Sequence, residues 1–61
     1  MKMTKEEISA VDKMDLELYR IRCAAMDFYE KTGSLDWLTL HDLVSDARRQ
    51  SNCMLPEKIR K

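Results

Sequence analysis

Few side chains in this 61-residue sequence could carry out chemistry, and their spacing forms no recognisable site. Cys23 and Cys53 are the only cysteines, and His41 is the only histidine. A structural zinc site needs four ligands in closely spaced pairs, so these three residues do not predict one. A disulfide is not expected either, because a hairpin turning at Gly33 would leave the two cysteine backbones about 15 Å apart along its axis. We therefore predict no metal and no cofactor.

Acidic residues near His41 are the remaining candidates for acid–base or metal chemistry. His41 and Asp42 are neighbours, which point about 100° apart on a helix, so we do not expect them to pair. The acidic pairs at helical spacing, such as Asp42 and Asp46, lack further ligands and are typical of solvated faces. A chain this small is also not expected to hold the cavity of about 300 Å³ usual for small ligands. The sequence predicts that the protein is not an enzyme.

Length and composition predict one small helical domain. The sequence has one glycine and one proline, and it contains 11 basic and 11 acidic residues, so its formal net charge is zero. This balance does not favour non-specific nucleic-acid binding. No apolar run approaches the ~20 residues that span a bilayer, and no apolar signal segment begins the chain, so we expect a soluble, cytoplasmic protein without membrane contact.

The first helix is predicted over residues 4–32. Thr4 is a candidate N-cap, and Glu7 three residues later completes a capping box. Gly33 can adopt the left-handed conformation that ends helices. The short connection over residues 32–34 places the next helix antiparallel and adjacent, so the fold class is an all-α, antiparallel helical hairpin.

The second helix is predicted over residues 35–52, followed by a basic, frayed tail over residues 53–61. Its start is open between Ser34 or Asp36 and a later turn at Thr39. Asn52 is a candidate C-cap and Pro56 prevents continuation, so the helix is expected to end between Gln50 and Met54.

Apolar residues of the first helix form two rows with heptad-like spacing. The first row is predicted to form the hairpin core with a stripe of the second helix. This row consists of Val11, Met14, Leu18, Ile21, Ala25 and Phe28. The stripe that we expect to face it consists of Leu40, Leu43, Val44 and Ala47. The second row of the first helix is predicted to contact an oligomer partner, and it consists of Leu16, Tyr19, Cys23 and Met26. One broad apolar face with tolerant neighbours remains the alternative.

Two functional hypotheses follow from these patterns. A chain this short buries little surface, so we expect it to self-assemble into a helical bundle, as a dimer or alternatively a trimer or tetramer. The leading hypothesis is a non-catalytic interaction or regulatory protein that binds itself and a protein partner. The alternative is a nucleic-acid-associated regulator, whose anionic partner would contact Arg48, Arg49, Lys58, Arg60 and Lys61.

Overall fold

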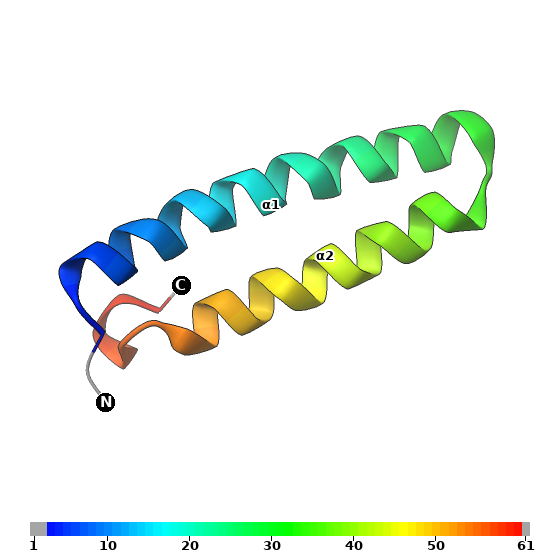
Figure 1. Cartoon of the computed structure of the whole chain (residues 1–61). Helices are drawn as coiled ribbons and strands as arrows, with labels where there is room; N and C mark the ends of the chain where they lie inside the picture. The colour runs from blue at the N-terminus through cyan, green and yellow to red at the C-terminus, as the bar shows by residue number, and fades with distance from the viewer. Residues whose placement is uncertain (1–2, 61) are drawn as a thin grey trace.

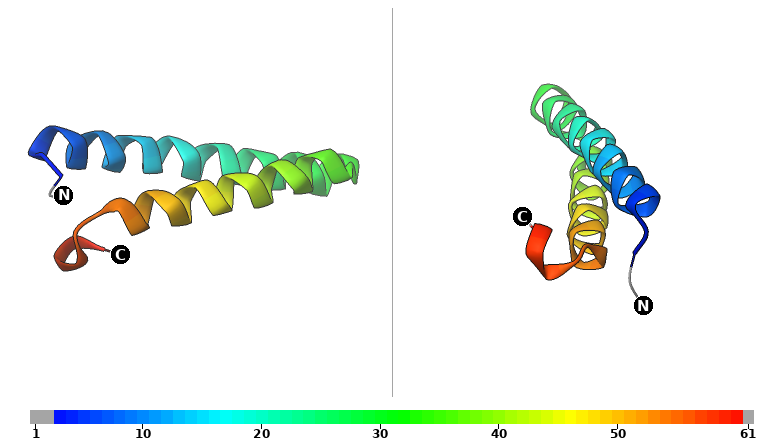
Figure 2. Two further views of the ribbon diagram at one scale, coloured as in Figure 1. Left: turned by 60° about the horizontal axis from the view of Figure 1, so that its bottom comes forward. Right: turned by 90° about the vertical axis from the view of Figure 1, so that its left-hand side faces the viewer.

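The computed structural model describes residues 3–60, and it shows a two-helix hairpin followed by one short helical turn (Figure 1). Helix α1 spans Lys5–Thr32, helix α2 spans Leu35–Met54, and the 3₁₀ turn η1 spans Glu57–Ile59. The two helices pack against each other, and both ends of the described chain, residues 3 and 60, lie at the end of the hairpin away from the turn (Figure 1). Their axes are inclined rather than parallel (Figure 2). The all-α hairpin prediction is confirmed.

The start of α1 has the predicted capping box. The Thr4 hydroxyl accepts a hydrogen bond from the Glu7 amide, and the Glu7 carboxylate accepts one from the Thr4 amide, both at 3.1 Å. These two bonds pair amide groups that the first turn of a helix leaves without partners. The first boundary of the fold is therefore set by residues close in sequence.

The turn between the helices depends on Gly33, which has φ 70° and ψ 7°. Its amide donates to the carbonyl of Tyr29 over 2.7 Å, and the Thr32 hydroxyl donates to the carbonyl of Phe28 over 2.8 Å. Ser34 precedes the first residue of α2, so the later start at Thr39 is excluded. Two residues thus suffice to reverse the chain.

The C-terminal region differs from the predicted frayed tail. Helix α2 continues to Met54, so Asn52 lies within the helix instead of capping it. Leu55 follows and is buried, at 4% exposure. The Arg60 guanidinium then donates to the carbonyls of Leu55 and Cys53, at 3.0 and 3.1 Å. Carbonyls at a helix C-terminus lack partners within the helix, and this arginine supplies donors for them.

We predict that Gly33→Ala lowers the free energy of unfolding by about 1 kcal/mol, because an alanine strains in the left-handed conformation. An added Cβ would meet no atom within 4 Å, so crowding contributes nothing to this loss. Gly33→Asn should lose less, since asparagine visits that conformation more readily. Urea unfolding followed by circular dichroism at fixed protein concentration measures both. Equal stability of the alanine variant and the parent would contradict the role given to this turn.

Candidate interaction surface

The contact between α1 and α2 contains many polar side chains. On α1, the buried and half-buried residues that recur every three or four positions are Ile8, Val11, Asp15, Leu18, Arg22, Ala25 and Tyr29, and Met26 is half-buried beside them. On α2 and at Leu55 directly after it, the corresponding residues are Trp37, Leu38, His41, Val44, Ser45, Arg48, Ser51, Asn52 and Leu55. Only Val11, Ala25, Val44 and Leu55 of these are fully buried. We call these two sets the seam.

An ion pair between Asp15 and Arg48 crosses the middle of the seam. The Arg48 Nε and Nη2 atoms donate to the two carboxylate oxygens of Asp15 over 3.1 and 3.3 Å. The side chains are 16% and 26% exposed for Asp15 and Arg48, and the guanidinium also lies 5.0 Å from the ring centroid of Tyr19. The hydrogen bonds to Asp15 raise the pKa of Arg48 above its usual value. This two-point contact fixes how the helices are aligned along their length.

Several residues predicted for the hairpin core are exposed instead, which corrects that assignment. Val11, Ala25 and Val44 are buried and Leu18 is half-buried, as predicted. The members that face solvent are Met14, Ile21, Phe28, Leu40, Leu43 and Ala47. The physical reason is that each helix is rotated about its axis so that Asp15 and Arg48 meet. Only one side of each predicted apolar stripe then lies in the contact, and the other side faces solvent. The six exposed residues are called the apolar face below.

The apolar face lies on one side of the hairpin and is shared by both helices. At 100° per residue, Ile21 points roughly 80° away from α2, and Leu40 and Ala47 point roughly 100° away from α1. Trp37, which shares a flank of α2 with Leu40, stacks on Phe28 with ring centroids 4.9 Å apart. This stacking shows that the two rows point to the same side. Leu43, 61% exposed, extends the surface outward.

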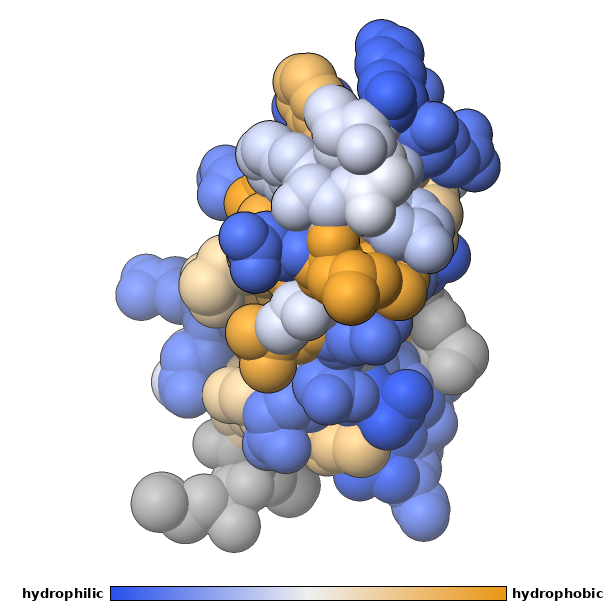
Figure 3. Space-filling view, turned by 90° about the vertical axis from the view of Figure 1, so that its right-hand side faces the viewer, coloured by the Kyte–Doolittle hydropathy of each residue, from blue (hydrophilic) through white to orange (hydrophobic). Residues whose placement is uncertain are grey.

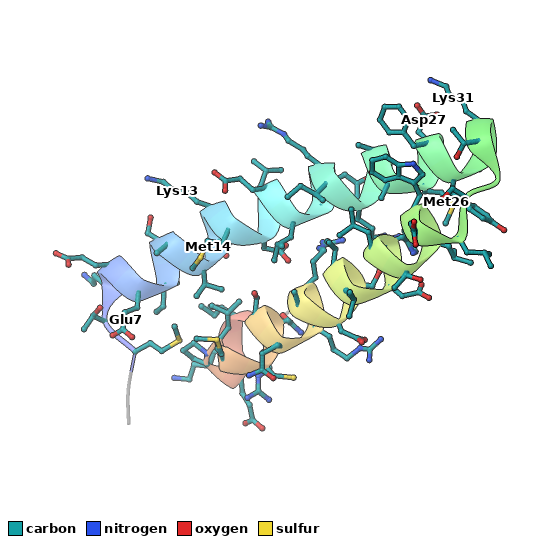
Figure 4. All side chains as sticks on the ribbon, turned by 45° about the vertical axis from the view of Figure 1, so that its right-hand side comes forward. Glu7, Lys13, Met14, Met26, Asp27 and Lys31 are labelled. Carbon is teal, nitrogen blue, oxygen red and sulfur yellow. The ribbon has the colours of Figure 1, made fainter. Side chains whose placement is uncertain are left out.

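The row predicted to be the oligomer interface lies on the other side of the seam. Asp12 and Arg49 line one hollow on this side, together with Asp15 and Arg48. Leu16, Tyr19 and Cys23 are exposed in the single hairpin and Met26 is half-buried, so this row stays a predicted interface. Charged residues accompany this row, and near the turn Asp27 pairs with Lys31 at 3.1 Å (Figure 4). The second predicted row therefore flanks the seam, whereas the first row is divided between the seam and the apolar face.

Hydrophobic side chains also reach the surface at the turn. Figure 3 looks onto this end of the hairpin and shows strongly hydrophobic atoms open to solvent between polar ones. Leu35, the first residue of α2, is 68% exposed, and Phe28 and its stacking partner Trp37 lie close by. Trp37 thus packs over the end of the hairpin, and the exposed apolar surface continues to the turn.

The basic residues predicted to contact an anionic partner are mostly engaged within the chain. Arg48 is held by Asp15, and Arg60 donates to the carbonyls at the end of α2. Arg49 pairs with Asp46 at 3.2 Å on the surface, and Lys58 is exposed. Lys61 lies outside the described residues. Arg48 and Arg49 line one hollow, and Lys58 and Arg60 line another.

Two of the candidate chemical groups, Cys23 and His41, line one hollow together with Arg22, Asp27 and Glu30. His41 and Asp42 do contact each other, at 3.2 Å, which corrects the expectation that they do not pair, and the histidine side chain is 18% exposed. Both cysteines are exposed and free. In the described part of the chain, no three His, Cys, Asp or Glu side chains are grouped to hold a metal ion.

A hollow larger than expected lies at the open end of the hairpin. Its volume is about 550 Å³, and its lining includes Met3, Met54, Pro56 and Lys58. This corrects the expectation that the chain has no cavity of ligand size. The lining is largely apolar and places no acid–base pair or nucleophile together, so it suggests contact with apolar groups.

Comparison with protein families, with characterised proteins and with solved structures gives no significant match. No helix in residues 3–60 is long and apolar enough to cross a membrane.

We predict that Asp15→Asn lowers the free energy of unfolding by about 1–3 kcal/mol, because the half-buried Arg48 charge loses its charged acceptor. Replacing both partners by apolar residues, as Asp15→Leu with Arg48→Met, should recover most of that loss. The matched control is Asp46→Asn, which breaks an exposed pair whose side chains are 67% and 75% exposed. That control should cost under about 0.5 kcal/mol.

Urea unfolding of the four proteins tests this ranking. Equal losses for Asp15→Asn and Asp46→Asn would mean that the seam does not depend on its ion pair.

Proposed function

We propose that this protein is a small, non-catalytic helical interaction protein, which acts through protein–protein contacts as a homo-oligomer. The observation that carries the proposal is that charged side chains lie in the contact between the helices while apolar side chains face solvent, which is the reverse of the usual arrangement. Asp15, Arg22, His41 and Arg48 are withdrawn into the seam, while large apolar side chains are left in solvent. A contiguous apolar face on such a small protein is typical of an interaction surface.

The energetics of a short chain support the same proposal. Four of residues 3–60 are buried, which gives a small core, and the one element described there besides the two helices is the short turn η1. Covering this face removes apolar surface from water at about 25 cal/mol per Å². Association would therefore supply stabilisation that the isolated hairpin lacks.

An interaction role also accounts for the distribution of charge. Asp15 and Arg48 compensate each other in the seam, and Arg49 has its acidic partner on the surface. The formal net charge is zero, so two copies meet without long-range repulsion. The alternative of a nucleic-acid-associated regulator has weaker support, because Arg48 and Arg60 are occupied by the chain itself.

We predict that light scattering after size exclusion, over a hundredfold range of concentration, finds a dimer or larger assembly. Ile21→Glu, on the apolar face, should shift the mass toward the monomer because it buries a charge in the contact. Leu16→Glu is the matched control, since Leu16 and Ile21 are 51% and 46% exposed but lie on opposite sides of the seam. The control should keep the parent mass.

A parent chain that is monomeric throughout the range would contradict self-assembly. If Leu16→Glu dissociates the assembly and Ile21→Glu does not, the interface is instead the row that contains Tyr19 and Cys23.

A further inference from the structure

We infer that the apolar face is covered by a second copy in one arrangement: α1 lies antiparallel to α1 of the second copy, the two turns are at opposite ends, and the two-fold axis passes between the Ile21 side chains. This inference rests on the proposed function and specifies its partner and geometry. The resulting assembly is a four-helix bundle.

The apolar side chains of α1 point in the direction expected for a helix that packs against two neighbouring helices. Val11, Leu18 and Ala25 face the seam, whereas Met14 and Ile21 point roughly 80° to one side. The middle of the combined stripe is therefore about 40–50° from the direction of α2. In a four-helix bundle each helix has two neighbours, and its apolar stripe points between them. One of these neighbours is α2, and the other is absent from a single hairpin.

The size of the apolar face fits a hairpin better than a single helix. From Met14 to Phe28 the face is about 21 Å long, and two packed helices make it roughly 20 Å wide. With the side chains at its ends it would bury roughly 500–600 Å² per copy, or about 1,000–1,200 Å² in total, which clears the roughly 1,000 Å² of a biological interface and reaches at most the lower limit of the stable class, about 1,200 Å². One added helix would leave part of this width open. A second hairpin has the matching width.

The two rows of the face share one midpoint, which locates the symmetry axis. The Asp15–Arg48 pair and the Phe28–Trp37 stack fix which residues are level across the hairpin, and interpolation between them sets Ile21 level with Leu43. Met14 and Phe28 lie equally far on either side of Ile21 in sequence. A two-fold rotation about an axis at this level therefore places the apolar row of each helix against the same row of the second copy.

Leu43 is likewise the centre of the row on α2. Leu40 precedes it by three residues and Ala47 follows it by four. The rotation sets Met14 level with Phe28 of the second copy, and it brings Leu40 within one residue, about 1.5 Å along the axis, of the level of Ala47 of the second copy. Each contact is thus apolar on both sides, and a large side chain meets a small one on α2.

In the other antiparallel arrangement both turns lie at the same end, and fewer apolar side chains would face apolar side chains of the second copy. It would stack α1 on α2 of the second copy at the same level. Met14 would then lie against Gln50, and Glu17 would lie against Ala47, which pairs polar with apolar groups at two positions. The arrangement with opposite turns avoids both of these mismatches.

Disulfide trapping of the full chain tests the arrangement. Cys23→Ser and Cys53→Ser first remove the two native thiols, which are both exposed. Ile21→Cys in this background should form a disulfide-linked dimer in nearly all molecules under mild oxidation, because the two thiols meet at the axis. Met14→Cys is the control and should stay unlinked by itself, since its two copies would lie roughly 20 Å apart. A mixture of Met14→Cys and Phe28→Cys chains should link to each other.

The outcomes separate this inference from the proposal on which it rests. Linking of Ile21→Cys to Leu43→Cys chains, without self-linking of Ile21→Cys, would overturn the arrangement and leave a homo-oligomer with both turns at one end. A dimer by light scattering in which none of these pairs links would place the interface elsewhere. A monomeric cysteine-free background that remains folded would overturn both the arrangement and self-assembly.

Discussion

The ion pair between Asp15 and Arg48 constrains the rest of this hairpin. Each charge needs its partner once it is withdrawn from water, and the two side chains meet only if α1 and α2 are turned to present them. That rotation carries Met14, Ile21 and Leu40 out of the contact and into solvent. The polar seam and the exposed apolar face therefore have one cause.

Local interactions at the ends of the helices complement this pair. The capping box of Thr4 and Glu7, the left-handed Gly33 and the Arg60 guanidinium each satisfy backbone groups that a helix end leaves unpaired. They define where each helix begins and ends, but they bury little apolar surface. The hairpin is thus well defined along its length while its cohesion remains limited by a small core.

The same division between polar seam and apolar face bears on function. Residues that could have contacted an anion are used internally, with Arg48 on Asp15 and Arg60 on backbone carbonyls. The apolar face remains exposed, and it is the surface on which the proposed function rests. Self-pairing about Ile21 would complete the core that a single copy lacks.

The sequence by itself determined the elements and their connection. Thr4, Glu7 and Gly33 act on neighbours within four residues, so the limits of α1 and the reversal of the chain could be predicted. Predicting which side of each helix meets the other failed for Met14, Ile21, Leu40 and Ala47, because heptad spacing gives apolar rows without assigning a partner to them. Only the tertiary structure decided that assignment, through contacts between Asp15 and Arg48, which are 33 residues apart in the chain.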